Sequence, residues 1–159
     1  MPSMAFCRKR ILVCSDSHGR RDHLLRALDQ QPAAGVFVFL GDGAADAEFL
    51  LRAYKETYLV RGNCDGASAL PLWQEFTCAG KKILCTHGHC AYVKYGIDDL
   101  LRAARDHSAD LALYGHTHEP RLDYEDGIYL FNPGSLADGN YGFVDITQAG
   151  IVCVQMKVR

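Results

Sequence analysis

The sequence predicts an α/β domain in which two β-sheets pack together with helices on the outside. The first two-thirds of the chain alternates short apolar runs with helical patterns, which is typical of βαβ units. The last third instead contains pairs of strand-like segments around short turns, as antiparallel hairpins do. No linker, repeat or long polar stretch separates the two parts, so we expect a single domain over residues 1–159.

The first part is built from short strands and amphipathic helices. Continuously apolar runs indicate strands that are covered on both faces, and we expect strands at residues 11–14, 36–40, 57–60 and 111–114. Apolar residues at helical spacing, such as Leu24, Leu25 and Leu28, indicate helices between these strands. We expect the helices at residues 22–30, 47–55 and 98–107.

Hairpin signals mark the remaining strands. Turns are indicated at Ala79-Gly80, at Asp126-Gly127 and at residues 147–150, and Asp-Gly between strand-like segments is a strong hairpin signal. The expected strand pairs are residues 73–78 with 82–85, 121–125 with 128–131, and 141–146 with 151–158.

Composition and charge exclude several classes of protein. The chain is 48% hydrophobic, which is enough to fill a core, and its net charge of -2 argues against a protein that coats nucleic acid. No apolar run approaches the roughly 20 residues of a membrane span. The apolar run after Arg8-Lys9-Arg10 covers only residues 11–14, which is too short for a signal peptide.

Cysteine usage points to a reducing compartment. The chain has 7 cysteines, an odd number, and no Cys-x-x-Cys pair. We therefore expect a cytoplasmic protein with free thiols, several of them buried as small hydrophobic side chains. A disulfide framework is the alternative.

Polar side chains follow five of the predicted strands, at the points where the strands end. In α/β proteins, ligands bind outside the carboxyl ends of the strands, so we expect these side chains to converge on one site. They are Asp16, His18, Asp42, Asn63, His87, His116 and His118. Imidazole and carboxylate groups together suit divalent manganese, iron, zinc or nickel. A single carboxylate at a strand end can bridge two ions, and Asp42 is the candidate.

The order Asp-x-His, Gly-Asp, Gly-Asn, His and Gly-His-x-His resembles the calcineurin-like metallophosphoesterase superfamily. Within it, the sequence is most similar to the small YfcE-type branch of bacterial and archaeal phosphodiesterases. The resemblance extends from Ile11 to Asn132-Pro133-Gly134-Ser135, a segment that we expect to support the metal site. It implies a four-layer α-β-β-α sandwich of two mixed sheets flanked by helices.

The resemblance also implies how the ligands divide between two ions. The first ion would be held by Asp16, His18 and His118, and the second by Asn63, His87 and His116, with Asp42 as the bridge. A hydroxide between the ions would attack phosphorus in line, without a covalent intermediate. The function implied is a metal-dependent phosphoesterase that acts on a small phosphoester, with manganese as the favoured metal.

One position departs from the pattern of many superfamily members. Where they carry Gly-Asn-His-Glu, this chain has Gly62-Asn63-Cys64-Asp65. A thiol titrates near 8.5 and is a poor general acid, so the proton donor to the leaving group is open. Cys64 and His89 are the candidate catalytic residues, and His89 could instead orient a metal ligand. Without a strong acid, a phosphodiester is the expected substrate rather than a phosphomonoester.

Two alternative functions are a protein-interaction scaffold and a metal-dependent nuclease. A protein-interaction scaffold of the same fold could lose metal ligands, whereas all seven ligand positions here keep a competent residue. A small metal-dependent nuclease would need extended nucleic-acid contacts, which this length and charge do not favour. Catalysis on a small phosphoester is therefore the leading hypothesis. We expect no membrane partner, and a homodimer is possible.

Overall fold

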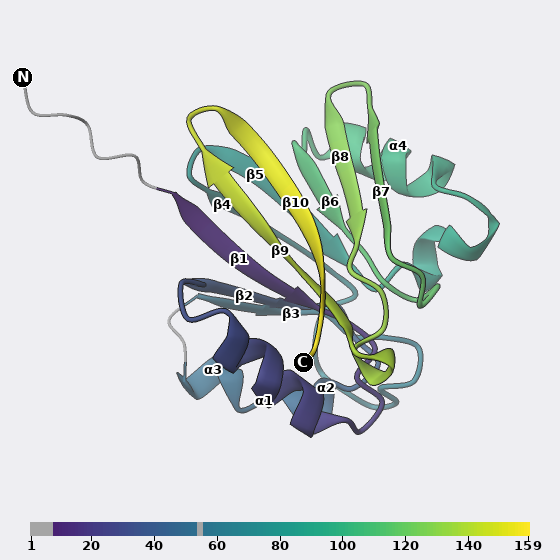
Figure 1. The fold of residues 1–159 in the computed structure, drawn as a ribbon. Coiled ribbons are helices and arrows are strands. Elements are labelled where there is room, and N and C mark those ends of the chain that lie inside the picture. Colours follow the sequence, from purple (N-terminus) through teal and green to yellow (C-terminus); the bar gives the residue numbers. More distant parts are fainter. Residues whose placement is uncertain (1–7, 54–55) are drawn as a thin grey trace, which may run out of the picture.

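A computed structural model describes residues 8–53 and 56–159, and their strands form two mixed five-stranded sheets (Figure 1). From edge to edge, the first sheet contains β10 (Gly150–Lys157), β9 (Asn140–Thr147), β1 (Lys9–Cys14), β2 (Val36–Phe39) and β3 (Thr57–Leu59). The second contains β4 (Trp73–Cys78), β5 (Lys81–Thr86), β6 (Leu111–Leu113), β8 (Ile128–Asn132) and β7 (Arg121–Glu125). In each sheet, three neighbouring strands are parallel. The other two strands of each sheet pair antiparallel with their neighbours.

Helices cover the outer faces of both sheets (Figure 1). The first sheet is covered by α1 (Arg21–Gln30), α2 (Ala44–Ala47) and α3 (Leu50–Ala53), and the second by α4 (Asp98–Asp106). Short 3-10 turns lie in the connections, namely η1 (His89–Ala91), η2 (Val93–Tyr95) and η3 (Leu136–Asp138). The four-layer α-β-β-α sandwich is thus confirmed.

Three apolar layers explain why the predicted strands are continuously apolar. Ile11 of β1 and Ile83 of β5 lie in the core between the two sheets. The next residues along, Leu12 and Leu84, point the other way and pack beneath the helices of their own sheets. Because successive side chains of a strand alternate between its faces, a strand that is covered on both sides has no polar position.

The helix expected at residues 47–55 is wrong as a single element. The structure has α2 and α3 instead, and residues 54–55 lie outside the described part of the chain. In the first turn of α3, the N–H groups of Leu51 and Arg52 donate to the carbonyl groups three residues back, those of Glu48 and Phe49. This tighter turn interrupts the α-helical ladder and places Phe49 against the outer core, where the Arg21 guanidinium lies over its ring. Such tertiary packing is invisible to helical periodicity.

Cysteines behave as expected over the described residues, where all six are free. Cys14, Cys78 and Cys85 are buried among apolar side chains, whereas Cys7 lies outside the described residues. Within the same part of the chain, every helix is too short or too polar to cross a lipid bilayer.

The turns that follow the parallel strands are joined to one another by backbone hydrogen bonds. After β1 and β2, Asp16 N–H donates to the Gly41 carbonyl at 2.8 Å and His18 N–H to the Asp42 carbonyl at 3.1 Å. After β5 and β6, Gly115 N–H donates to the His87 carbonyl at 2.9 Å. The predicted ligands therefore sit on turns that hold each other in register.

Gly41 shows how closely these turns approach. Its φ of +103° lies in the left-handed region that favours glycine. A Cβ atom at this position would lie 2.5 Å from the backbone nitrogen and 2.8 Å from the Cα of Gly62, on the turn after β3. Because both neighbours are backbone atoms, no side-chain rotation could relieve the contact.

We expect Gly41→Ala to lower the free energy of unfolding by about 2–4 kcal/mol, from overpacking and left-handed strain together. Gly35→Ala is the matched control, because a Cβ there would meet no atom within 4 Å and its φ is not positive. The control should change stability by no more than about 1 kcal/mol. Urea denaturation of both variants measures the difference, and equal losses would contradict the close approach of the two turns.

Candidate metal centre

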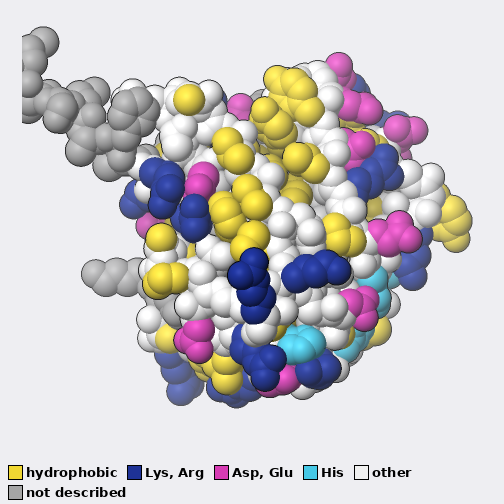
Figure 2. All heavy atoms as spheres, in the orientation of Figure 1, with side chains coloured by type: hydrophobic (Ala, Val, Ile, Leu, Met, Phe, Trp, Pro, Cys, Tyr) yellow, Lys and Arg dark blue, Asp and Glu magenta, His cyan; other side chains and the backbone are white. Residues whose placement is uncertain are grey.

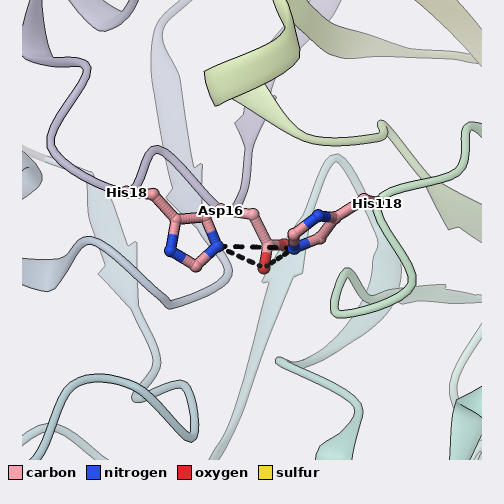
Figure 3. A group of neighbouring side chains, drawn as sticks. All are labelled: Asp16, His18 and His118. Carbon is pink, nitrogen blue, oxygen red and sulfur yellow. Dashed lines mark hydrogen bonds and ion pairs between the residues drawn. The ribbon is translucent and has the colours of Figure 1, made fainter.

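Six of the seven predicted ligands come together as two neighbouring groups at the ends of the parallel strands. One group is Asp16, His18 and His118, shown in Figure 3, and the other is Asp42, His87 and His116. Within each group, the candidate ligand atoms all lie within 4.8 Å of one another. Each group combines residues from the turns of both sheets.

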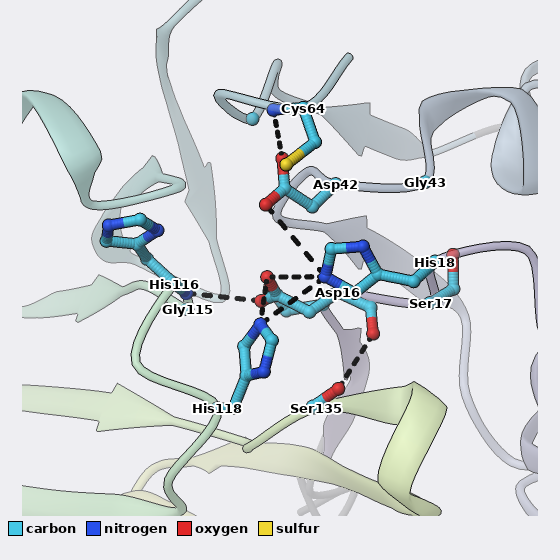
Figure 4. Close-up of polar contacts among 12 residues, drawn as sticks. Asp16, Ser17, His18, Asp42, Gly43, Cys64, Gly115, His116, His118 and Ser135 are labelled. Carbon is cyan, nitrogen blue, oxygen red and sulfur yellow. Dashed lines mark hydrogen bonds and ion pairs between the residues drawn. The ribbon is translucent and has the colours of Figure 1, made fainter.

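Asp16 lies at the middle of the assembly, as Figure 4 shows. Its side chain is fully buried, and Oδ1 is 3.1 Å from His87 Nε2 and 3.2 Å from His118 Nε2. The other oxygen accepts hydrogen bonds from the His116 N–H at 3.1 Å and from the Ser15 hydroxyl. Asp16 therefore contacts histidines of both groups.

Asp42 also reaches both groups. Its Oδ2 atom is 3.3 Å from His87 Nε2 and 4.0 Å from His18 Nε2. Its Oδ1 atom accepts a 2.7 Å hydrogen bond from the Cys64 N–H, which fixes the orientation of the carboxylate (Figure 4). A carboxylate placed between histidines of two groups has the position that a bridging ligand needs.

Backbone strain is concentrated in the same residues. Left-handed φ costs L-residues about 1–2 kcal/mol each, and such strain gathers at functional sites because the surrounding structure must maintain it. Five of the six residues in the two groups have positive φ: Asp16 (55°), His18 (43°), Asp42 (58°), His116 (73°) and His118 (64°). These turns are therefore shaped to aim side chains, at a cost in stability.

The electrostatics follow from two carboxylates around one buried imidazole. Burial lowers the pKa of His87, but its hydrogen bonds to Asp16 and Asp42 outweigh burial and raise that pKa to about 9. Burial raises the pKa of Asp16 and Asp42, yet contact with His87 holds the pKa of both carboxyl groups below the usual range. Burial and the charge of His87 lower the pKa of His116 to about 4.

This donor set fits divalent cations. Two ionised carboxylates and four imidazoles form two groups of the type that bind first-row transition metals. A metal ligand must be deprotonated, so a bound cation would displace the proton that the two carboxylates stabilise on His87. The two groups are therefore candidates for a dinuclear site.

The structure leaves the predicted roles of three residues untested, namely Asn63, Cys64 and His89. Asn63 and Cys64 lie on the turn beside Asp42, but the Asn63 amide nitrogen faces Cys64 Sγ at 3.5 Å, so its role as a ligand stays a prediction. His89 Nδ1 is 3.1 Å from His87 Nδ1. That contact suits a residue that orients His87, and a part in proton transfer also stays a prediction.

Asp65 is a supporting residue that sequence reasoning missed. Its carboxylate accepts hydrogen bonds of 2.7–2.9 Å from the backbone N–H groups of Gly62, Asp42, Gly43 and Ala44. It therefore clamps the Asp42 turn to the turn after β3. An acidic residue that closes a Gly-Asn turn is a signal for such a clamp, because Asp side chains often accept hydrogen bonds from nearby backbone.

The segment from Asn132 to Ser135 supports the site, as the sequence resemblance implies. The Asn132 amide donates to the Gly115 carbonyl at 3.2 Å and to the Thr117 hydroxyl at 2.9 Å, which holds the turn between His116 and His118. The Ser135 hydroxyl donates to the Asp16 carbonyl at 2.9 Å (Figure 4). Both contacts stabilise the strained backbone of the ligands.

Comparison with known proteins agrees with this geometry. The chain is 30% identical to the probable metallophosphoesterase YsnB of Bacillus subtilis (strain 168) over 126 residues, which is 79% of this chain and 74% of YsnB. It is 29% identical to phosphodiesterase YfcE of Escherichia coli (strain K12), over 86% of this chain and 87% of YfcE.

The fold has a close counterpart among solved structures. A predicted phosphoesterase of Streptococcus pneumoniae TIGR4 superposes with a TM-score of 0.82 and 25% sequence identity, over 96% of this chain and 91% of that protein. The family model described as "Calcineurin-like phosphoesterase superfamily domain" matches residues 10–152. A match across so much of the chain shows that it belongs to the calcineurin-like phosphoesterase superfamily.

Proposed function

We propose that this protein is a dinuclear-metal-dependent phosphoesterase that hydrolyses phosphodiesters in preference to phosphomonoesters. The observation that carries the proposal is the position of Asp42, whose carboxylate lies between His18 of one ligand group and His87 of the other. Family membership and the similarity to phosphodiesterase YfcE support the reaction type.

In this proposal, six residues would each serve one ion and Asp42 would serve both. Asp16, His18 and His118 would hold one ion, and Asn63, His87 and His116 would hold the second. When bound, two divalent ions, with manganese as our proposed pair, supply Lewis acidity and activate the attacking water. Hydrolysis would form a bond between the water oxygen and phosphorus and break one ester phosphorus–oxygen bond, and the proton lost by the water would pass to the leaving alcohol or to solvent.

The remaining residues keep the ligands aligned. The Cys64 N–H engages one oxygen of Asp42 and leaves the other directed at the histidines. His89 Nδ1 lies 3.1 Å from His87 Nδ1, a contact that would help to orient the His87 ring. Precise placement of this kind matters, because partners that orient metal ligands are typically worth about 10–100-fold in metal affinity or activity.

The preference for diesters follows from what stands at position 64. A monoester dianion with a poor leaving group needs a proton donor, and a neutral thiol releases its proton reluctantly near pH 7. A diester carries one negative charge and is less demanding in this respect. The substrate that we propose is therefore a small phosphodiester whose leaving group is stable as an anion.

Substitution of the bridge should cost more activity than substitution of a terminal ligand. We expect Asp42→Asn to lower kcat by about 10³-fold, because a charge that serves both ions is lost. Asn63→Ala removes one neutral ligand and should cost at least tenfold less. Rates on bis(4-nitrophenyl) phosphate at saturating metal compare the two, and similar losses would contradict the bridging role of Asp42.

Metal removal should separate an enzyme from a protein-interaction scaffold. A metal that binds only the folded state stabilises it by about 2.7 kcal/mol at 100 times its dissociation constant. For a chain of this size, chelation should therefore lower Tm by about 5–10 °C, and added manganese should restore Tm and activity together. A Tm that does not change when the chelator is added, together with no hydrolysis under any divalent metal, would favour the scaffold.

Replacement of the Cys64 thiol should have a small effect. Cys64→Ser keeps the backbone N–H that holds Asp42, so we expect the diester rate to change by less than about tenfold, below the usual loss of a general acid. The test is kcat for aryl diesters whose leaving groups span several pKa units, in both forms. A flat dependence in the native protein that steepens in Cys64→Ser would identify Cys64 as the acid.

A further inference from the structure

Two cavities that differ in charge lie beside the predicted metal ligands. His18 and Asp42 lie in the wall of one cavity, of about 440 Å³. Thr117, between His116 and His118, lies in the wall of the other, of about 340 Å³. A phosphodiester has two ester groups, so two separate cavities near the ligands are relevant to its recognition.

The first cavity is acidic. Its described wall contains four carboxylates, those of Asp42, Asp46, Glu48 and Asp65, and neither lysine nor arginine. Two of these carboxylates are held in place, because Asp46 accepts hydrogen bonds from the Ser17 hydroxyl and the Gly19 N–H, and Asp65 accepts backbone N–H groups. An ester group with a negative charge of its own would be repelled there.

The second cavity carries two cations and one carboxylate, from Lys94, Arg121 and Glu119. Arg121 uses Nε and Nη2 on Asp123, so its charge is largely balanced. Lys94 is exposed and takes part in none of the ion pairs between the described residues. Figure 2 shows histidine side chains at the surface with positively and negatively charged side chains near them.

We propose that Lys94 selects phosphodiesters that carry a further anionic group, such as a second phosphate, on the ester group that enters its cavity. The chemistry is the attraction between a mobile ammonium group and an anion. The other ester group, which is uncharged until its bond to phosphorus breaks, then faces the acidic cavity. This inference rests on the proposed function, because it names the substrate class for the same metal centre.

Two matched substrates test the proposal. One is ethyl 4-nitrophenyl phosphate, and the other carries a phosphonate at the end of the ethyl group. Hydrolysis of either one releases 4-nitrophenolate and leaves an alkyl phosphate, while the stable carbon–phosphorus bond of the second substrate stays intact. The native protein should prefer the phosphonate diester through a lower KM, and the ratio of the two kcat/KM values should fall as salt screens the charge.

Lys94→Gln should reduce that ratio by about two- to fivefold, the range of an exposed ion pair. Lys81→Gln is the control, since it removes the same charge at the start of β5, at the opposite end of that strand from His87. The control should keep the native ratio. An unchanged ratio in Lys94→Gln, or an equal fall in both variants, would overturn the role of Lys94.

The experiment distinguishes failure of the substrate selection by Lys94 from failure of the proposed function. If ethyl 4-nitrophenyl phosphate is hydrolysed but the ratio does not respond to Lys94→Gln, only the substrate selection is wrong. If neither diester is hydrolysed with any divalent metal, the proposed function is wrong and the substrate selection with it.

Discussion

The hydrogen bonds of the buried Asp16 carboxylate are the interaction on which the rest of the site depends. Asp16 follows a strand of the first sheet, yet its oxygens contact His116 and His118 after β6 and His87 after β5 in the second sheet. This side chain thereby joins the turns of the two sheets, as Asp42 also does through His87. A carboxylate can occupy this position because several donors surround it, which offsets the cost of burying its charge.

The backbone conformations that position the candidate ligands around that carboxylate lower the stability of the fold. Most of the candidate ligands sit in left-handed backbone conformations, which the chain would not adopt in isolation. Asp65, Asn132 and Ser135 offset part of this strain with hydrogen bonds to the turns. The rigid ligand geometry therefore belongs to a network of supporting residues, as well as to the ligands themselves.

The side chains that surround the candidate ligands make fewer contacts than the ligands themselves. The segment after η1 anchors through buried Val93, whereas its neighbours Tyr92 and Tyr95 are 63% and 91% exposed. Side chains that make few contacts can change without disturbing the turns that carry His87 and His116. The proposed metal chemistry and the proposed choice of substrate thus depend on parts of the structure that can vary separately.

The sequence by itself determined the layered fold and the kinds of residue at the strand ends. Continuous apolar runs and Asp-Gly turns are local signals, so the strands and hairpins could be predicted from them. Only the tertiary structure decided how closely Asp42 approaches the histidines of both groups, that Asp65 clamps its turn, and that two short helices form at Ala44–Ala47 and Leu50–Ala53. These features depend on contacts between residues far apart in the chain, and such contacts exist only once both sheets have assembled.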